Sequence, residues 1–315
     1  MTLYRGYDRR ELDREYSPSS RVADFGAELA AYAGQGRRAY RELPGHRELR
    51  YGPAAPELVD FFPAGPGAPL HVFVHGGFWQ ELGKEDGAFP ALDLVPRGTA
   101  FATVGYGLAP RWTVEEIVDQ TVRAVAHLVD RAAELGVDPD RIVLSGSSAG
   151  AHLAACALLD PRLTGRIAAA VLLSGVYDLA PVALTYVNEP LGLDADRARR
   201  LSPLLADPAG LAALPPLVLA LGEHETDEFA RQQDEFAAAA RAAGVPVRAL
   251  RAAGRNHFDL VFDLGRPDTP LGAEVAALAG AAVRAGLPEQ RRGAAGAQVE
   301  QVEPVASVAG EPGGS

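Results

Sequence analysis

Residues 141–159 read RIVLSGSSAGAHLAACALL, and this stretch decides the fold. Its first four residues form an apolar run typical of a buried strand, and Ala151–Leu159 has the composition of a buried helix. Between them, Gly146 and Gly150 flank Ser148 in the pattern G-x-S-x-G. A serine at the apex of a sharp strand-to-helix turn has strained backbone, and the turn closes only if the residues two before and two after it are nearly free of side chain. The stretch therefore predicts a serine exposed at the carboxyl end of a strand.

Short apolar runs alternate with longer helical periods on both sides of this stretch. That alternation predicts an α/β fold, an eight-stranded mostly parallel sheet with helices on both faces. The candidate strands are Leu49–Tyr51, Leu58–Phe62, Leu70–His75, Ala100–Gly105, Arg141–Leu144, Ala168–Leu173, Leu217–Leu221 and Val247–Leu250. We expect the insertion at about 176–216, between the sixth and seventh strands, to form a small cap over the carboxyl edge of the sheet.

Three segments have clear helical signals. Thr113 begins one helix, with Glu116 completing a capping box, and Gly136 ends it. A second helix is predicted over Asp227–Ala243. A third is predicted over Arg21–Tyr40, after the start signal SPSS at 17–20.

Composition bounds the classes of function. The 315 residues include 41 acidic and 30 basic side chains, and the formal charge of −11 disfavours nucleic acid and anionic membranes as partners. The first thirty residues hold no apolar run that could serve as a signal-peptide core, so a cytoplasmic protein is expected. We expect residues 1–287 to form one domain. Residues 288–315, without aromatic, Leu or Ile residues, are predicted to be a disordered tail.

Further motifs supply the partners that a serine nucleophile needs. The sequence HGGFW at 75–79 follows an apolar strand, where the backbone amides of Gly77 and Phe78 can join that of Ala149 in an oxyanion hole. His75 itself is expected to anchor this loop. His257 is the one histidine after the last predicted strand and is therefore the candidate base.

The acid is expected in the loop after Leu217–Leu221, which reads GEHETDE at 222–228. Thr226 has the character of a helix N-cap, so Asp227 and Glu228 are explained as first-turn charges. Glu225 is the preferred acid, and Asp227 is its competitor. The remaining histidines have no metal-ligand spacing, and no phosphate-binding glycine motif is present, so no metal or cofactor is expected.

These motifs resemble those of the kynurenine formamidases (arylformamidases) of the α/β-hydrolase superfamily. The resemblance rests on HGGFW at 75–79, YGLAP at 106–110, SAGAHL at 148–153, NEPLGL at 188–193 and NHF at 256–258. It covers roughly residues 12–285. It departs at one position, because the family usually has an aspartate where this chain has Glu225.

The resemblance implies a cofactor-free serine hydrolase that converts N-formyl-L-kynurenine to L-kynurenine and formate. Ser148 would attack the formyl carbon, His257 would take its proton and Glu225 would orient the imidazole. Phe78 and Trp79 are expected either to wall an aromatic substrate pocket or to pack in the core beneath the cap. A hormone-sensitive-lipase-like carboxylesterase, another biosynthetic amide hydrolase and a binding protein on the same scaffold are the alternatives. A small-molecule substrate is expected, and a homodimer stays open.

Overall fold

The computed structural model describes residues 2–280, which belong to a single unit of the fold. Within these residues eight strands form one sheet in the order β1-β2-β4-β3-β5-β6-β7-β8. The β1–β2 and β2–β4 pairs are antiparallel and the others are parallel. The strands are β1 Arg47–Arg50, β2 Leu58–Phe62, β3 Ala68–Val74, β4 Ala100–Val104, β5 Val137–Ser147, β6 Ala169–Leu173, β7 Leu217–His224 and β8 Val247–Asn256. The predicted α/β-hydrolase sheet is confirmed, with β5, β7 and β8 longer than expected.

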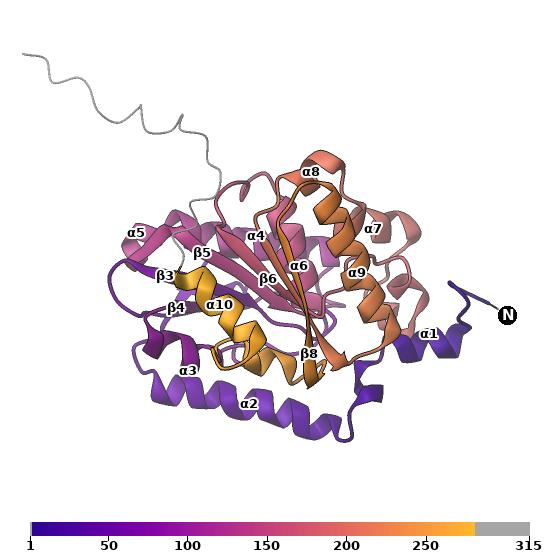
Figure 1. Ribbon diagram of the computed structural model, residues 1–315, viewed down its shortest axis with the longest axis horizontal. Coiled ribbons are helices and arrows are strands. Elements are labelled where there is room, and N and C mark those ends of the chain that lie inside the picture. The colour runs from indigo at the N-terminus through magenta and orange to yellow at the C-terminus, as the bar shows by residue number, and fades with distance from the viewer. Residues whose placement is uncertain (1, 281–315) are drawn as a thin grey trace, which may run out of the picture. The chain divides into compact units, whose positions relative to one another are not determined.

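Helices cover both faces of the sheet (Figure 1). The α-helices are α1 Arg9–Glu15, α2 Phe25–Glu42, α3 Ala91–Leu94, α4 Val114–Asp130, α5 Ala132–Leu135, α6 Ala149–Leu159, α7 Ala195–Arg200, α8 Pro208–Ala212, α9 Asp227–Ala242 and α10 Pro270–Gly280. The 3₁₀ turns are η1 Pro18–Arg21, η2 Val95–Arg97, η3 Val182–Leu184, η4 Tyr186–Asn188, η5 Pro203–Leu205 and η6 Leu260–Asp263.

Two apolar cores result from the alternation of side chains along the strands. In β3, Val72 and Val74 belong to the core that includes α4, α6 and α9, whereas Phe73 belongs to the core that includes α2, α3 and α10. Each fully buried aliphatic or aromatic side chain contributes roughly 1.5–3 kcal/mol through removal from water. Because both faces are covered, the parallel strands are apolar runs rather than alternating ones.

The predicted helices differ from the observed ones at their ends. Asp24, whose carboxylate accepts a hydrogen bond from the Ala27 amide, starts α2, so the SPSS segment forms the separate turn η1 instead of the helix start. The capping box of Thr113 and Glu116 is present. The helix that follows is interrupted at Arg131, and Gly136 ends α5 with a left-handed φ of 75°.

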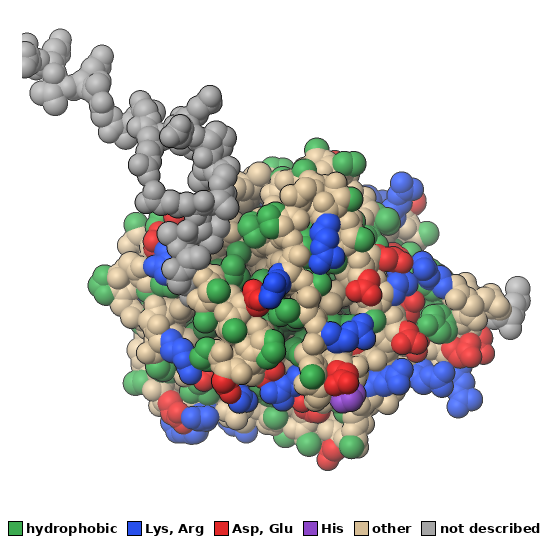
Figure 2. Space-filling view, in the orientation of Figure 1, with side chains coloured by type: hydrophobic (Ala, Val, Ile, Leu, Met, Phe, Trp, Pro, Cys, Tyr) green, Lys and Arg blue, Asp and Glu red, His purple; other side chains and the backbone are tan. Residues whose placement is uncertain are grey.

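Short helices and turns, η3 to α8, fill the insertion between β6 and β7. The predicted tail, residues 288–315, lies outside the described residues. Within residues 2–280 no helix combines the length and apolar character that crossing a bilayer requires. Figure 2 shows acidic and basic side chains interspersed on one face of the molecule.

Candidate active site

Ser148 lies at the turn between β5 and α6, at the carboxyl edge of the sheet. Its backbone has φ 56° and ψ −120°, a conformation that costs free energy for a residue with a side chain. The two flanking glycines make the turn possible. A Cβ atom on Gly146 would lie 2.2 Å from the Gly150 carbonyl oxygen, and one on Gly150 would lie 2.1 Å from the Val74 carbonyl oxygen. The Ser148 amide donates to the Leu173 carbonyl at 2.8 Å, which holds the apex against β6.

The loop after β3 packs directly against this turn. A Cβ atom on Gly76 would lie 2.9 Å from the Ser147 carbonyl oxygen and 3.2 Å from the Ser148 Cβ. The backbone amides of Gly77, Phe78 and Ala149 have no acceptor among the described residues. Unpaired amides on both sides of a serine are the donors that an oxyanion needs. The loop is strained, since Phe78 has a left-handed φ of 48°.

His75 anchors the start of this loop, as expected from the sequence. Its Nδ1 donates to the Gly76 carbonyl at 2.9 Å, and its ring stacks on Tyr106 with 4.1 Å between centroids. The Tyr106 hydroxyl donates to the His75 carbonyl oxygen at 2.7 Å. Burial lowers the pKa of His75 to about 4, so the ring is neutral at physiological pH.

His257 and Glu225 meet at the same edge of the sheet. The His257 Nδ1 and the Glu225 Oε2 are 2.7 Å apart, and their side chains are only 5% and 2% exposed. Because a carboxylate only accepts, Nδ1 carries the proton and Nε2 is left unprotonated in the neutral ring. The other carboxylate oxygen of Glu225 accepts from the Gly222 amide at 2.9 Å and from the Ser174 hydroxyl.

Asp227, the competing acid, occupies the exposed first turn of α9. Thr226 is its N-cap residue, but the Thr226 hydroxyl donates to the Glu15 carbonyl oxygen at 2.7 Å rather than accepting from the helix. Glu225 is thus the acid-loop carboxylate that contacts the histidine.

Trp79 lies in the core, which is one of the two placements that the sequence left open, and it is not part of the pocket wall as a substrate-binding residue would be. It is 0% exposed, and its indole Nε1 donates to the Nδ1 of His152 at 3.3 Å. The Nε2 of His152 donates in turn to the Leu201 carbonyl at 2.7 Å. Trp79 therefore connects the loop after β3 to α6 and, through His152, to the insertion. Phe78, in contrast, lines the pocket.

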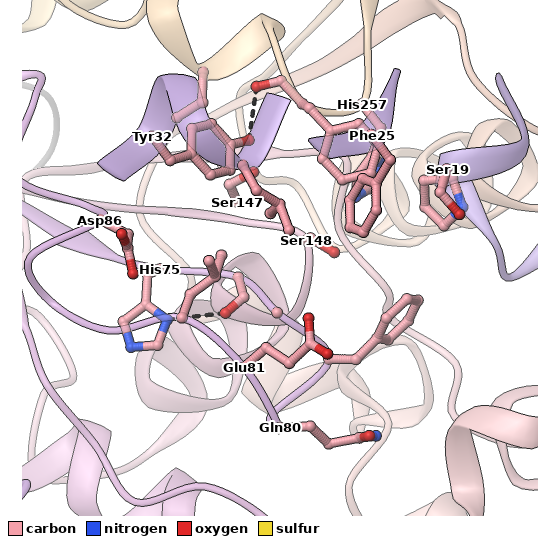
Figure 3. Close-up of a pocket in the computed structure, with 18 of the residues that line it drawn as sticks. Ser19, Phe25, Tyr32, His75, Gln80, Glu81, Asp86, Ser147, Ser148 and His257 are labelled. Carbon is pink, nitrogen blue, oxygen red and sulfur yellow. Dashed lines mark hydrogen bonds between the residues drawn. The ribbon is translucent and has the colours of Figure 1, made fainter. Parts of the chain in front are cut away.

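A pocket opens in front of Ser148 (Figure 3). Ser148 and His257 line it together with Gly76, Gly77 and Phe78. Sequence reasoning missed most of its other walls, which include Pro18, Ser19, Phe25, Leu29 and Tyr32 from the N-terminal segment and Gln80, Glu81, Leu82 and Asp86 after the HGGFW motif. It also missed Ser174, although that residue directly follows β6 at the carboxyl edge. Among residues 2–280 no group of three or more metal-ligating side chains converges on an ion site.

Comparison with known proteins places this chain in a family. Residues 71–260 match the family described as having the alpha/beta hydrolase fold. The chain is 30% identical to the kynurenine formamidase of Danio rerio over 283 residues, which are 84% of this chain and 94% of that protein. The chain belongs to the kynurenine formamidase family of α/β-hydrolases.

Other similar proteins include both formamidases and esterases. The kynurenine formamidase of Drosophila melanogaster is 29% identical over 285 residues, 82% of this chain and 94% of that protein. A solved structure of a candidate thioesterase from Silicibacter sp. tm1040 has a TM-score of 0.74 at 29% identity, over 85% of this chain and 99% of that one. A thermostable carboxylesterase from a metagenomic library has a TM-score of 0.67 at 24% identity, over 84% and 97% of the two chains, and so shares the fold. The family is therefore one of hydrolases.

The stability of this protein is expected to depend on pH because three of its histidines are buried. Burial lowers the pKa of His71 to about 3 and those of His75 and His152 to about 4. As pH falls from 7 to 5.5, unfolded histidines with an ordinary pKa of about 6.5 bind protons that the folded rings do not. The unfolded state is then favoured, by about 1 kcal/mol for each histidine. Urea denaturation at the two pH values should show this loss of stability, and equal stabilities would contradict the neutral, buried state of these rings.

Proposed function

We propose that this protein is a serine hydrolase of aryl formamides, with N-formyl-L-kynurenine as its substrate and L-kynurenine and formate as its products. The observation that carries the proposal is the similarity to kynurenine formamidases of Danio rerio and Drosophila melanogaster over more than four fifths of the chain. The groups that line the pocket support the proposal. A serine, a histidine with a carboxylate partner and unpaired backbone amides are the groups that acyl transfer requires.

In the proposed first step, Ser148 Oγ bonds to the formyl carbon while its proton passes to the Nε2 of His257. The formyl oxygen becomes negative and accepts hydrogen bonds from the amides of Gly77, Phe78 and Ala149. Glu225 stabilises the imidazolium through Nδ1. The C–N bond then breaks, and His257 returns the proton to the departing arylamine nitrogen.

The second step hydrolyses the formyl-enzyme. Water attacks the formyl carbon, His257 accepts its proton and the same amides bind the second oxyanion. Breakage of the bond to Ser148 Oγ releases formic acid, which ionises to formate, and the proton on His257 returns to Ser148. The formyl group is the smallest acyl group, so the aromatic walls of the pocket serve the aryl part of the substrate.

A carboxylesterase is the second candidate. The structural similarity to the metagenomic carboxylesterase favours it, as does 31% identity over 216 residues to an isoprenylcysteine alpha-carbonyl methylesterase of Arabidopsis thaliana. That relative matches only 61% of this chain and 51% of its own length, so it carries less weight than the formamidases.

Turnover of N-formyl-L-kynurenine, followed by absorbance of the released arylamine and compared with that of phenyl acetate, tests the proposal. We expect kcat/KM for the formamide to exceed that for the ester by about tenfold or more, the scale of selectivity that one well-matched pocket supplies. Ser148→Ala serves as the background control. Turnover of the ester alone would reject the formamidase proposal and favour the carboxylesterase.

A further inference from the structure

Glu81 is the carboxylate that faces the reacting groups of the pocket. It lines the same cavity as Ser148 and His257, and Figure 3 shows its carboxylate pointing into the space in front of the Ser148 hydroxyl. That carboxylate is exposed and has no hydrogen-bond or ion-pair partner among the described residues. The mechanism above gives it no role. An unpaired charge on the pocket wall therefore remains for a ligand to use.

The position of Glu81 is fixed relative to the oxyanion donors. The amides of Gln80 and Glu81 both donate to the Gly77 carbonyl, at 2.9 and 3.0 Å. The Gln80 side chain donates to the Val187 carbonyl at 2.9 Å, which fastens this turn to the insertion. A substrate whose carbonyl oxygen rests on the Gly77 amide therefore lies next to the turn that carries Glu81, whose backbone packs against Gly77.

The charges around the pocket favour a cationic ligand group. Its described lining contains no Lys or Arg side chain. The nearby Lys84 is already paired with Asp60 at 2.6 Å and with Glu48 at 3.2 Å. The second lining carboxylate, Asp86, accepts a hydrogen bond from the Gly83 amide at 3.1 Å. An anionic group in front of Ser148 would thus meet negative charge without a basic partner.

Aromatic rings form the wall on the N-terminal side. Phe25 packs against Phe258 with 5.1 Å between ring centroids, and Tyr32 stacks on Phe89 at 5.8 Å. The Tyr32 hydroxyl is used internally, donating to the Phe258 carbonyl at 2.6 Å. This wall suits an aryl group, and its ring faces also attract cations.

We propose that Glu81 is a specificity-determining residue that binds an ammonium group on the aryl substrate. This inference rests on the proposed function, in which the amino group of the amino-acid side chain of the substrate supplies the cation. The carboxylate of that amino acid lies toward the open mouth of the pocket. Uncharged aryl formamides would be turned over less efficiently, and those with an anionic group near the formamide least of all.

The test uses two aryl esters of the same shape, meta-(trimethylammonio)phenyl acetate and meta-tert-butylphenyl acetate, of which only the first is charged. The wild-type protein should prefer the cationic ester. Glu81→Gln should lower kcat/KM for that ester about fivefold, mainly through KM, and leave the neutral ester within about twofold, because one exposed charge contact is removed. Glu81→Lys should lower kcat/KM for the cationic ester further. Glu189→Gln makes the same charge change at an exposed position of the insertion outside the pocket, and it should alter neither ester.

The outcomes separate this inference from the proposed function. Equal effects of Glu81→Gln on both esters, or a wild-type protein without preference for the cation, would overturn the role of Glu81. N-formyl-L-kynurenine, assayed with the same variants, should follow the cationic ester. If it is not hydrolysed at all while the ester preference disappears in Glu81→Gln, the formamidase proposal fails and the cation-binding role stands.

Discussion

Ser148→Ala should reduce kcat for aryl formamides and aryl esters by roughly 10³-fold or more, because the residues of a catalytic triad act as a unit. The protein should stay folded, since alanine removes only one hydroxyl from a turn whose geometry depends on Gly146 and Gly150. Steady-state kinetics together with the thermal unfolding midpoint would measure both effects.

Ser147→Ala is the matched control, because it removes the same hydroxyl one residue earlier. Ser147 ends β5 and lies beside the apex of the turn. Its loss should change kcat far less than that of Ser148. If Ser148→Ala retained near-normal turnover, or if Ser147→Ala were the inactive variant, the nucleophile would be misassigned.

Local sequence was sufficient for the elements that a few neighbouring residues determine. The apolar run before Gly146 and the small residues around Ser148 specify a buried strand and a closed turn without reference to the rest of the chain. The capping box of Thr113 and Glu116 is equally local, with only two residues between its two hydrogen-bonding partners. Such features follow from spacing alone.

Contacts between distant segments could not be predicted in the same way. Tyr32 reaches the pocket because α2 packs on a sheet face shared with Phe73, and its hydroxyl binds a carbonyl 226 residues later. The residues next to Trp79 in the sequence are the same whether its side chain faces substrate or the core, so they do not predict its orientation. The left-handed φ of 62° at Trp79 and the acceptor nitrogen of His152 direct the indole into the core. Neither is visible in a pattern of apolar and polar residues.

The acid loop illustrates how a local rule and a tertiary contact combine. The sequence pattern left Glu225 and Asp227 as alternatives two residues apart. The bend of the chain before α9 turns Glu225 toward His257 and leaves Asp227 exposed in the first helical turn. Ser174 and the Gly222 amide then hold one oxygen of Glu225, so that the other faces the imidazole.

Glu225→Gln should cost up to about 10⁴-fold in kcat while nearly preserving packing. The glutamine oxygen can still accept from the Gly222 amide and the Ser174 hydroxyl, but its NH₂ group then faces the His257 Nδ1–H. Two donors cannot share a hydrogen bond, so the ring shifts its proton to Nε2, which can no longer accept the proton of Ser148. Glu225→Asp should retain more activity than Glu225→Gln because it keeps the charge.

Asp227→Asn is the matched control, and it should cost only helix-end electrostatics of about 0.3–1 kcal/mol in unfolding free energy with little change in kcat. Kinetics and urea denaturation of the three variants distinguish the two carboxylates, and an inactive Asp227→Asn beside an active Glu225→Gln would transfer the catalytic role to Asp227.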